Sequence, residues 1–230
     1  MTASPFATCE ELVRRHDPDR YVATLFAPAA KRPFLFALYA FYYEVARVPV
    51  VAHEPMIGAI RLAWWQETVD GARAGSPRPH DVARALCETL AVHDLPAASF
   101  ARIIDGRHRE VDHEPFADTE EATAHAEGTS GTLMGLAARI LGGASDELAR
   151  EAGIAYALAG RRGAMFAKVE TELPAAAKAH LAAARRQAIP PEALAAFLPA
   201  SLVGLYLKRA DPPLWRKQIT LFLAAKRGRL

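Results

Sequence analysis

Apolar residues recur three or four positions apart through most of the chain, and this helical spacing is the feature that most constrains the fold. No segment shows a convincing alternation of apolar and polar residues, which is typical of a half-buried β-strand. Alanine, the residue with the highest helix propensity, supplies much of the 51% hydrophobic fraction, and only 14 residues are glycine. The sequence therefore predicts an all-α protein.

Prolines and other turn-forming residues divide the chain into successive helices. Asp17-Pro18 precedes the first apolar stretch, Pro49 should end the next helix, and Gly142-Gly143 should stop a helix near the middle. The expected helices cover residues 34–48, 56–74, 80–92, 96–111, 118–141, 145–169, 174–187, 192–208 and 214–227. Neither an internal repeat nor a linker is visible, so we expect one domain over residues 1–230.

Charge and composition exclude several classes of protein. The chain has 28 Lys and Arg residues and 26 Asp and Glu residues, a net charge of +2 that does not favour nucleic acid as a partner. The two cysteines, Cys9 and Cys87, cannot form a disulfide framework or a four-cysteine zinc site. No unbroken apolar run reaches the roughly 20 residues that span a bilayer, and residues 1–20 lack a signal-peptide stretch. We therefore expect a cytoplasmic protein.

Histidine and acidic residues do not show the spacing of a metal site. In the segment HREVDHE, His108 and His113 are five positions apart, whereas two ligands on one helix face lie three or four apart. Asp112 and Glu114 lie beside them. We interpret this segment as a solvated helix end of mixed charge, and no metal ligands are assigned.

Residues 127–131, EGTSG, are small and polar but lie within a helical pattern. They match neither of the glycine-rich phosphate-binding motifs GxGxxG and GxxxxGK[ST]. Two interpretations remain: the segment contacts a ligand, or it lets a neighbouring helix backbone approach closely at Gly128, Ser130, Gly131 and Gly135. We favour close helix packing.

The sequence resembles the squalene/phytoene synthase family in four segments that share its order and spacing: DPDRY, LFAPAAKRPFLFALYAFYYEVARV, EPMIGAIRLAWWQETVDG and HAEGTSGTLMGLAARILG. The likeness covers about residues 17–143 and returns in AAFLPASLVGLYLKR. It implies the isoprenoid synthase fold, a helical bundle around a central cavity. The family's enzymes condense two prenyl diphosphates head to head, and two aspartate-rich motifs hold the Mg²⁺ ions that neutralise the leaving diphosphate.

Both aspartate-rich motifs are missing from this chain. Their polar and acidic positions carry Ala46, Arg47 and Val50 in the first motif, and Ala157, Gly160 and Ala164 in the second. We expect Arg47 to pair with Glu44, the only acidic residue between Phe34 and Val51. No catalytic residue, metal ligand or cofactor is therefore assigned.

The same losses are typical of the branch of the family that includes the mitochondrial complex I assembly factor. The resemblance thus implies a non-catalytic assembly or interaction factor whose partner is a client protein, such as a respiratory-complex subunit. The alternative is a divergent prenyltransferase that uses Mg²⁺. It would need substitute carboxylates, for which the candidates are Glu44, Glu54, Asp112 and Glu127. Because their spacing does not reproduce two facing metal-binding pairs, we prefer the non-catalytic hypothesis.

The resemblance also implies candidate contacts to an isoprenoid or other lipid. A retained apolar cavity would be lined by Tyr39, Tyr43, Trp65, Glu127, Ser130 and Leu133. The aromatic residues among them would serve equally as core. Arg47, Arg161 and Arg162 are candidate contacts to a phosphorylated lipid, since arginine matches phosphate geometry without a metal. Pairing of these arginines with surface acids is the interpretation that we prefer.

Residues 214–230 predict a basic amphipathic helix. From Lys208 onward the chain has seven basic residues and only one acidic residue, Asp211, interleaved with large apolar residues that include Trp215. Such a helix suits the surface of an anionic membrane or an acidic partner, and we expect peripheral contact with the inner membrane if that holds. The competing interpretation is an ordinary terminal helix docked on the bundle, which has the same pattern.

Overall fold

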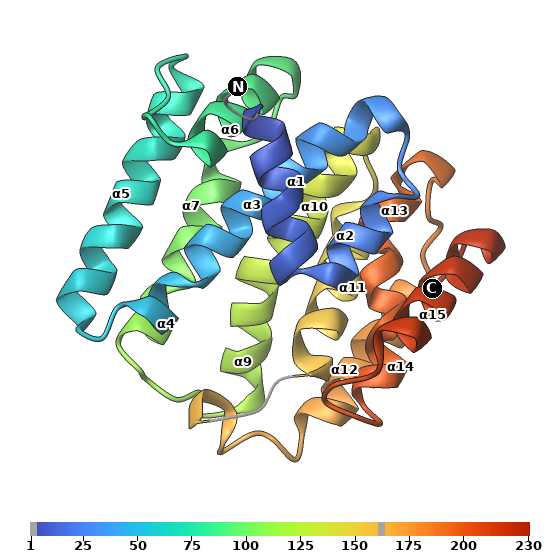
Figure 1. The fold of residues 1–230 in the computed structure, drawn as a ribbon. Coiled ribbons are helices and arrows are strands. Elements are labelled where there is room, and N and C mark those ends of the chain that lie inside the picture. The colour runs from blue at the N-terminus through green and yellow to red at the C-terminus, as the bar shows by residue number, and fades with distance from the viewer. Residues whose placement is uncertain (1–3, 161–163) are drawn as a thin grey trace. The chain divides into compact units, whose positions relative to one another are not determined.

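The computed structural model describes residues 4–160 and 164–230, and every regular element in these two ranges is helical. This confirms the all-α expectation. Contacts divide the chain into two compact units, Met1–His113 and Glu114–Leu230, which run from blue to green and from green to red in Figure 1. The expectation of a single domain over residues 1–230 stays a prediction.

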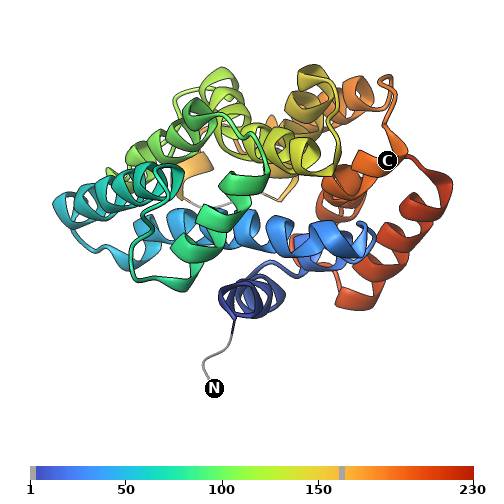
Figure 2. The same cartoon turned by 90° about the horizontal axis from the view of Figure 1, so that it is seen from above.

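The first unit is organised around one buried helix, α3. Nine of the fifteen residues of α3 are buried, and α1 and α6 both pack against it. Figure 2 looks along the axis of α1, which crosses α3 steeply. The helical elements of this unit are α1 (Pro5–His16), α2 (Pro18–Thr24), η1 (Ala29–Lys31), α3 (Arg32–Ala46), α4 (Val48–Val51), α5 (Pro55–Arg73), α6 (Asp81–Val92), α7 (Ala97–Asp105) and α8 (His108–Val111).

The chain remains helical on both sides of Arg47, although the sequence analysis places a helix end at Pro49. Helix α3 ends at Ala46, two residues earlier than expected, and the short helix α4 follows with Pro49 in its first turn. Proline is tolerated there because the N–H that it lacks would have no partner within the helix. Pro49 therefore starts a helical turn instead of ending one.

The stretch Ala29–Val51 is long and apolar enough to cross a membrane by length and composition alone. Lys31, Arg32, Glu44 and Arg47 interrupt it, which is why its apolar runs stay shorter than the roughly 20 residues that span a bilayer. Within its most apolar window 56% is buried inside the structure, and a core helix passes the same test. The stretch is apolar because most of α3, which lies within it, is buried in the core of the first unit.

The second unit is organised around α11, which packs against α10, α12 and the π-helical turn η2. The Glu151 carboxylate on α11 and the His180 ring on α12 are hydrogen-bonded, with 2.6 Å between Oε2 and Nδ1. The helical elements of this unit are α9 (Thr119–Ala126), η2 (Glu127–Gly131), α10 (Thr132–Leu141), α11 (Asp146–Ala159), η3 (Ala164–Phe166), α12 (Leu173–Ala184), η4 (Pro191–Ala193), α13 (Leu194–Phe197), η5 (Leu198–Leu202), α14 (Val203–Tyr206) and α15 (Leu214–Arg227).

Local capping accounts for several helix ends in the second unit. The Asp118 carboxylate accepts a hydrogen bond from the Glu121 N–H at 2.9 Å, and the Ser145 hydroxyl accepts one from the Leu148 N–H at 3.1 Å. Gly142 and Gly143 follow α10 with φ of 137° and 98°, values that disfavour a side chain. The helix expected over residues 118–141 is therefore confirmed, with the π-helical turn inside it.

Three of the expected helices are wrong in length or continuity. The helix expected over 145–169 ends at Ala159, before Gly160, and residues 164–172 form a short 3₁₀ helix followed by turns. Helix 192–208 is divided into short pieces, with Pro199 inside the 3₁₀ segment η5. Helix 96–111 breaks at Gly106 into α7 and α8. Glycine and proline both weaken a continuous helix. The apolar periodicity continues past them, so by itself it does not predict these interruptions.

The segment EGTSG packs closely against α11, as the favoured interpretation of the sequence expects. A Cβ atom on Gly153 of α11 would lie 2.4 Å from the Gly131 Cα and 2.5 Å from the Gly131 N. Gly135 faces the same helix, where its added Cβ would lie 3.7 Å from the Cβ of Ala149. Gly153 was not singled out from the sequence, because no local motif marks a glycine that is needed for a distant contact.

We expect Gly153→Ala to destabilise the protein by about 1–3 kcal/mol or more, because the added methyl group would overlap the backbone of η2, which cannot rotate away. Urea unfolding measures the loss. Gly204→Ala is the matched control, since a Cβ there has no atom within 4 Å. Equal stability of the two variants would contradict the close contact between Gly131 and Gly153.

Candidate functional site

The candidate contact residues divide between the two units. Tyr39, Tyr43, Arg47 and Trp65 lie in the first unit, and the second holds Glu127, Ser130 and Leu133. Arg161 and Arg162 lie outside the described residues. A single cavity lined by residues of both units therefore stays a prediction.

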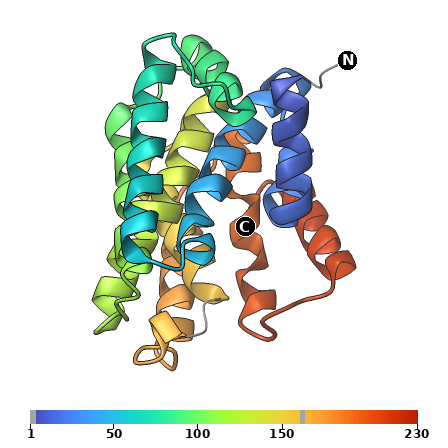
Figure 3. The same ribbon diagram turned by 60° about the vertical axis from the view of Figure 1, so that its left-hand side comes forward.

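One pocket of the first unit brings two of these candidates together. It has a volume of about 240 Å³ and lies at the end of α3, where α4 and α5 meet the residue that precedes α6. Figure 3 shows α4 and the beginning of α5 at this end of the unit. The lining residues are Glu44, Arg47, Val48, Val51, Arg61, Trp64, Trp65 and His80. Arg47 and Trp65 were candidates from the sequence, whereas Arg61 and His80 were missed.

Aromatic rings form the floor of this pocket. The rings of Trp64 and Trp65 meet edge to face at 4.9 Å, and the His80 ring lies 5.8 Å and 5.5 Å from them. Trp65 is buried and also packs against Phe41 of α3, at 5.8 Å between ring centres. His80 Nδ1 is buried without a hydrogen-bond partner in the structure. The floor is therefore closely packed and carries one polar atom without a hydrogen-bond partner.

The charges around the pocket are partly paired. Arg47 Nη1 lies 3.2 Å from Glu44 Oε1, which confirms the pairing expected from their spacing. The Arg47 guanidinium also lies 5.8 Å from the centre of the Tyr43 ring. Arg61 is exposed, and in the described ranges no ion pair involves it. The mouth of the pocket therefore holds one arginine whose charge is not matched.

Two buried arginines lie close to the ring of Tyr42 elsewhere in the first unit. The guanidinium of Arg20 lies 5.1 Å from the centre of the Tyr42 ring, and that of Arg107 lies 5.0 Å from it. Arg20 also lies over Tyr39, at 5.8 Å. Tyr39, proposed from the sequence as a cavity residue, is buried and in contact with Arg20, and its place in a lipid cavity stays a prediction.

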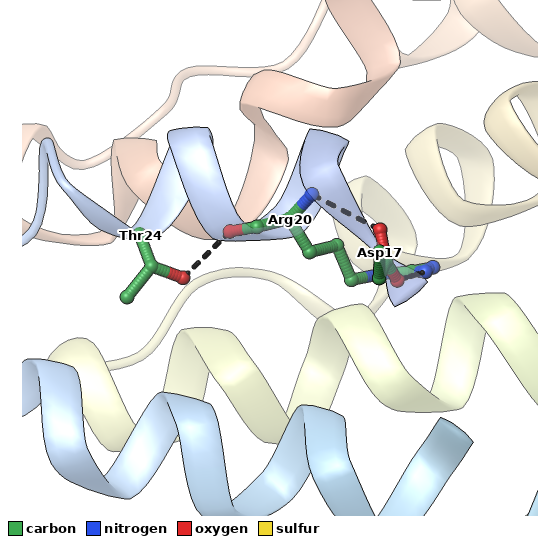
Figure 4. A network of polar contacts seen from close by, with 3 residues as sticks. All are labelled: Asp17, Arg20 and Thr24. Carbon is green, nitrogen blue, oxygen red and sulfur yellow. Dashed lines mark hydrogen bonds and ion pairs between the residues drawn. The ribbon is translucent and has the colours of Figure 1, made fainter. Parts of the chain in front are cut away.

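Asp17 holds Arg20 in this position (Figure 4). One carboxylate oxygen of Asp17 caps α2 by accepting a hydrogen bond from the backbone N–H of Arg20 at 3.1 Å. The other oxygen accepts a hydrogen bond from Nη1 of the same arginine at 2.6 Å. The Thr24 hydroxyl donates to the Arg20 carbonyl oxygen at 2.7 Å. Asp17 therefore serves both as a helix cap and as the counter-ion of a buried arginine.

Arg107 is only 2% exposed and stays charged. Burial by itself lowers the pKa of Arg107, but Tyr42 and Glu110 outweigh burial, so the pKa lies above its ordinary value. Nη1 donates to Glu110 Oε1 at 2.6 Å, while Nε and Nη2 have no hydrogen-bond partner. Burial raises the pKa of Tyr39, which keeps that phenol neutral. The cluster thus combines two charged arginines with the neutral phenol of Tyr39.

The residues at the expected metal positions do not fit Mg²⁺. Ala46 and Val50 carry no ligand oxygen, and Arg47 brings positive charge beside Glu44. In the second unit, the corresponding Ala157 and Gly160 also lack oxygen in their side chains. Over residues 4–160 and 164–230, no three His, Cys, Asp or Glu side chains lie close enough together to hold a metal ion.

The other candidates for chemistry are equally inert. Asp112, His113 and Glu114 are exposed after the end of α8, which confirms the interpretation of that segment as a helix end of mixed charge. Cys9 is buried, and burial raises the pKa of its thiol to about 12, so it is protonated and unreactive at neutral pH. Neither the exposed residues after α8 nor Cys9 therefore supplies a nucleophile that is activated at neutral pH.

Comparison with known proteins gives a family and two kinds of relative. A family model described as squalene/phytoene synthase matches residues 13–161. The NADH dehydrogenase (ubiquinone) complex I, assembly factor 6 of Bos taurus is 34% identical over 134 residues, and that of Homo sapiens is 33% identical, each over 58% of this chain. The 15-cis-phytoene synthase of Synechococcus elongatus is 22% identical over 60% of this chain. The matches span 40% of the length of the two mammalian assembly factors and 44% of the synthase.

Solved structures share the fold. A dehydrosqualene synthase crystallised with a ligand superposes with a TM-score of 0.75 at 14% identity, over 97% of this chain and 96% of its own. Squalene synthase HpnC from Alicyclobacillus acidocaldarius gives 0.71 at 20% identity, over 97% and 94%. These similarities confirm the isoprenoid-synthase-like helical fold.

We expect Asp17→Asn to destabilise the protein by about 1.5–3 kcal/mol, because it removes the negative charge that faces Arg20 while an amide oxygen can still cap α2. Asp17→Ala should cost more, since the cap is lost as well. Urea unfolding compares the variants. The matched control is Glu11→Gln, which breaks the ion pair with Arg14 at the same spacing but on the exposed surface, where no measurable loss is expected.

Proposed function

The chain belongs to the squalene/phytoene synthase family, and from this premise we propose that it is a non-catalytic member that assists assembly of the respiratory NADH dehydrogenase, complex I. The observation that carries the proposal is the replacement of the metal-binding positions. Where the family's enzymes need carboxylates for Mg²⁺, the described residues are Ala46, Val50 and an arginine already paired with Glu44. A diphosphate leaving group would have no metal to neutralise it there.

The relatives support the same function. Assembly factor 6 of mammalian complex I is more similar to this chain than the phytoene synthase is, at 34% against 22% identity. The solved synthases support the fold and leave the activity open, because their identity to this chain is low. The client of the protein is accordingly proposed to be a subunit of the NADH dehydrogenase.

Deleting the gene in its host should lower the amount of assembled NADH dehydrogenase. The measurement is the NADH:quinone oxidoreductase activity of isolated membranes, together with the amount of the intact complex on a native gel. Re-expression of the wild-type chain should restore both. Succinate:quinone oxidoreductase activity is the control for the membranes, and normal NADH dehydrogenase in the deletion strain would contradict the proposal.

The alternative, a divergent prenyltransferase, predicts a different result with the purified protein. A diphosphate bound at a hundredfold excess over its Kd would stabilise the native state by about 2.7 kcal/mol. We expect farnesyl or geranylgeranyl diphosphate to give no Mg²⁺-dependent rise in Tm and no condensed product. A rise that requires Mg²⁺, together with product, would favour the enzyme.

The C-terminal helix supports a location at the inner membrane. Leu221 and Ala224 of α15 are buried, and α15 packs against η5. Trp215, Ile219 and Phe222 project from the opposite side of the helix, where Trp215 and Phe222 are each 56% exposed. Helix α15 is therefore docked and also presents a second, outward apolar face.

Basic residues accompany this outward face. Arg216, Lys226 and Arg227 are exposed, and Lys217 lies 4.9 Å from the centre of the Tyr206 ring. Exposed apolar side chains beside lysine and arginine are typical of helices that lie on anionic membranes. We propose that the protein is cytoplasmic and associates peripherally with the inner membrane through α15.

Replacing both Trp215 and Phe222 with serine should weaken binding to vesicles that contain anionic lipid at least tenfold. Burial of each large apolar side chain contributes about 1.5–3 kcal/mol. Vesicle co-sedimentation measures the loss, and neutral vesicles or high salt should also reduce binding by the wild type. Leu25→Ser with Phe26→Ser, a pair exposed in the first unit, is the matched control. Unchanged binding by the α15 variant would exclude this helix as the contact.

A further inference from the structure

We propose that the pocket beside Trp64 and the exposed apolar strip that leads to it form a docking surface for a client protein. The partner is an apolar segment of that protein with a carboxylate among its side chains. This inference rests on the proposed function, because it names the surface that holds the client. We call this surface, made of Val50, Met56, Ile57, Ile60, Arg61 and Trp64, the α4–α5 surface.

Large apolar side chains are concentrated on the α4–α5 surface. Val50 is 77% exposed and Ile60 is 63% exposed, and Met56 and Ile57 are exposed beside them. Ile57, Ile60 and Trp64 are three and four positions apart on α5, so they share one face of the helix. Single exposed apolar residues are common on protein surfaces, whereas a cluster of them is typical of an interaction site.

The other face of α5 is occupied by the fold. Leu62 is fully buried, and a Cβ on Gly58 would lie 2.4 Å from a methyl carbon of Val111, so the helix rests directly on that residue. Trp65 packs on α3 through Phe41. Ile57 and Ile60 are thus on a helix whose other face is packed on the fold. The surface itself would therefore lose little conformational entropy when a partner binds.

The size of the pocket indicates a side chain as its occupant. Its volume of about 240 Å³ lies below the roughly 300–1,000 Å³ that is typical of small-molecule sites. Its lining includes the aliphatic residues Val48 and Val51 beside the aromatic floor of Trp64, Trp65 and His80. Such a space accepts one apolar side chain of a bound segment. Tryptophan and arginine are also the residue types that contribute most to protein–protein affinity.

The small net charge around the pocket favours a protein segment over an anionic membrane as the partner. At the pocket Glu44 and Arg47 neutralise each other, and close by Glu67 pairs with Arg78, whose guanidinium lies over Trp64 at 5.2 Å. This leaves Arg61 as one unmatched cation, whereas α15 presents several. Arginine binds a carboxylate through two parallel hydrogen bonds. A flat bilayer would neither fill the pocket nor use a single cation.

The experiment places a photo-crosslinking benzoylphenylalanine at Ile60 of the full-length protein in host cells. Val92 is the matched control position, because it is also an apolar residue that is 63% exposed, on α6 of the same unit. We expect Ile60 to crosslink to a subunit of the NADH dehydrogenase, identified by mass spectrometry, and Val92 to give at least tenfold less of that product. Arg61→Glu should lower the yield at Ile60 at least tenfold, and Arg61→Lys should restore part of it.

Other outcomes would overturn the docking surface. Crosslinks to lipid alone would assign the α4–α5 surface to the membrane, and crosslinks to a second copy of this chain would assign it to self-association. Equal yields at Ile60 and Val92 would remove any specific partner. If Ile60→Asp with Arg61→Glu, shown to fold by its Tm, still restores the NADH dehydrogenase in the deletion strain, the docking surface is wrong while the proposed function stands. If the deletion itself has no effect, the proposed function fails.

Discussion

The burial of α3 is the constraint on which the first unit depends. A helix with apolar residues on nearly every side must be covered by other helices, and α1 and α6 provide that cover. The cover ends where α3 ends, so Arg47 and the short helix α4 emerge at the surface. Val50 and the pocket beside Trp64 lie at this exit. The position of the candidate site is thus a consequence of how the core is closed.

Polar groups inside the first unit are accommodated by aromatic rings as much as by counter-ions. Arg20 has the carboxylate of Asp17, and both Arg20 and Arg107 lie against Tyr42. A guanidinium is less strongly hydrated than an ammonium group and stacks on aromatic faces, so it can be buried where a lysine would lose its charge. In the second unit, η2 and α11 come into close contact because Gly131 and Gly153 have no side chain.

The same fold serves catalysis in the family's enzymes, and here the chemistry of its key positions has changed. Carboxylates that would attract Mg²⁺ are replaced by small apolar residues and by Arg47, whose charge Glu44 neutralises. Large apolar side chains on α4, α5 and α15 are left exposed instead. Exposed apolar area has a cost in water, and it is retained where a partner or a membrane covers it. These changes are the basis of the proposal that the protein binds other components and does not convert a substrate.

Much of this was determined by the sequence alone, namely whatever depends on residues close together in the chain. The helical periodicity, the pairing of Glu44 with Arg47, the basic helix that begins at Leu214 and the loss of the aspartates all involve a few neighbouring positions. The resemblance carried by the four segments from DPDRY to HAEGTSGTLMGLAARILG supplied the fold. Helix ends were less certain, because Gly160 and Pro199 interrupt a periodicity that continues past them.

Only the tertiary structure decided which distant residues meet. It placed Gly153 against Gly131, buried Arg107 beside Tyr42, and brought Arg61 and His80 to one pocket. It also buried Tyr39 against Arg20. Each of these contacts joins separate helices, and the distance between two helices depends on the packing of all the side chains between them. Local sequence determines what each helix can present, and packing determines what it faces.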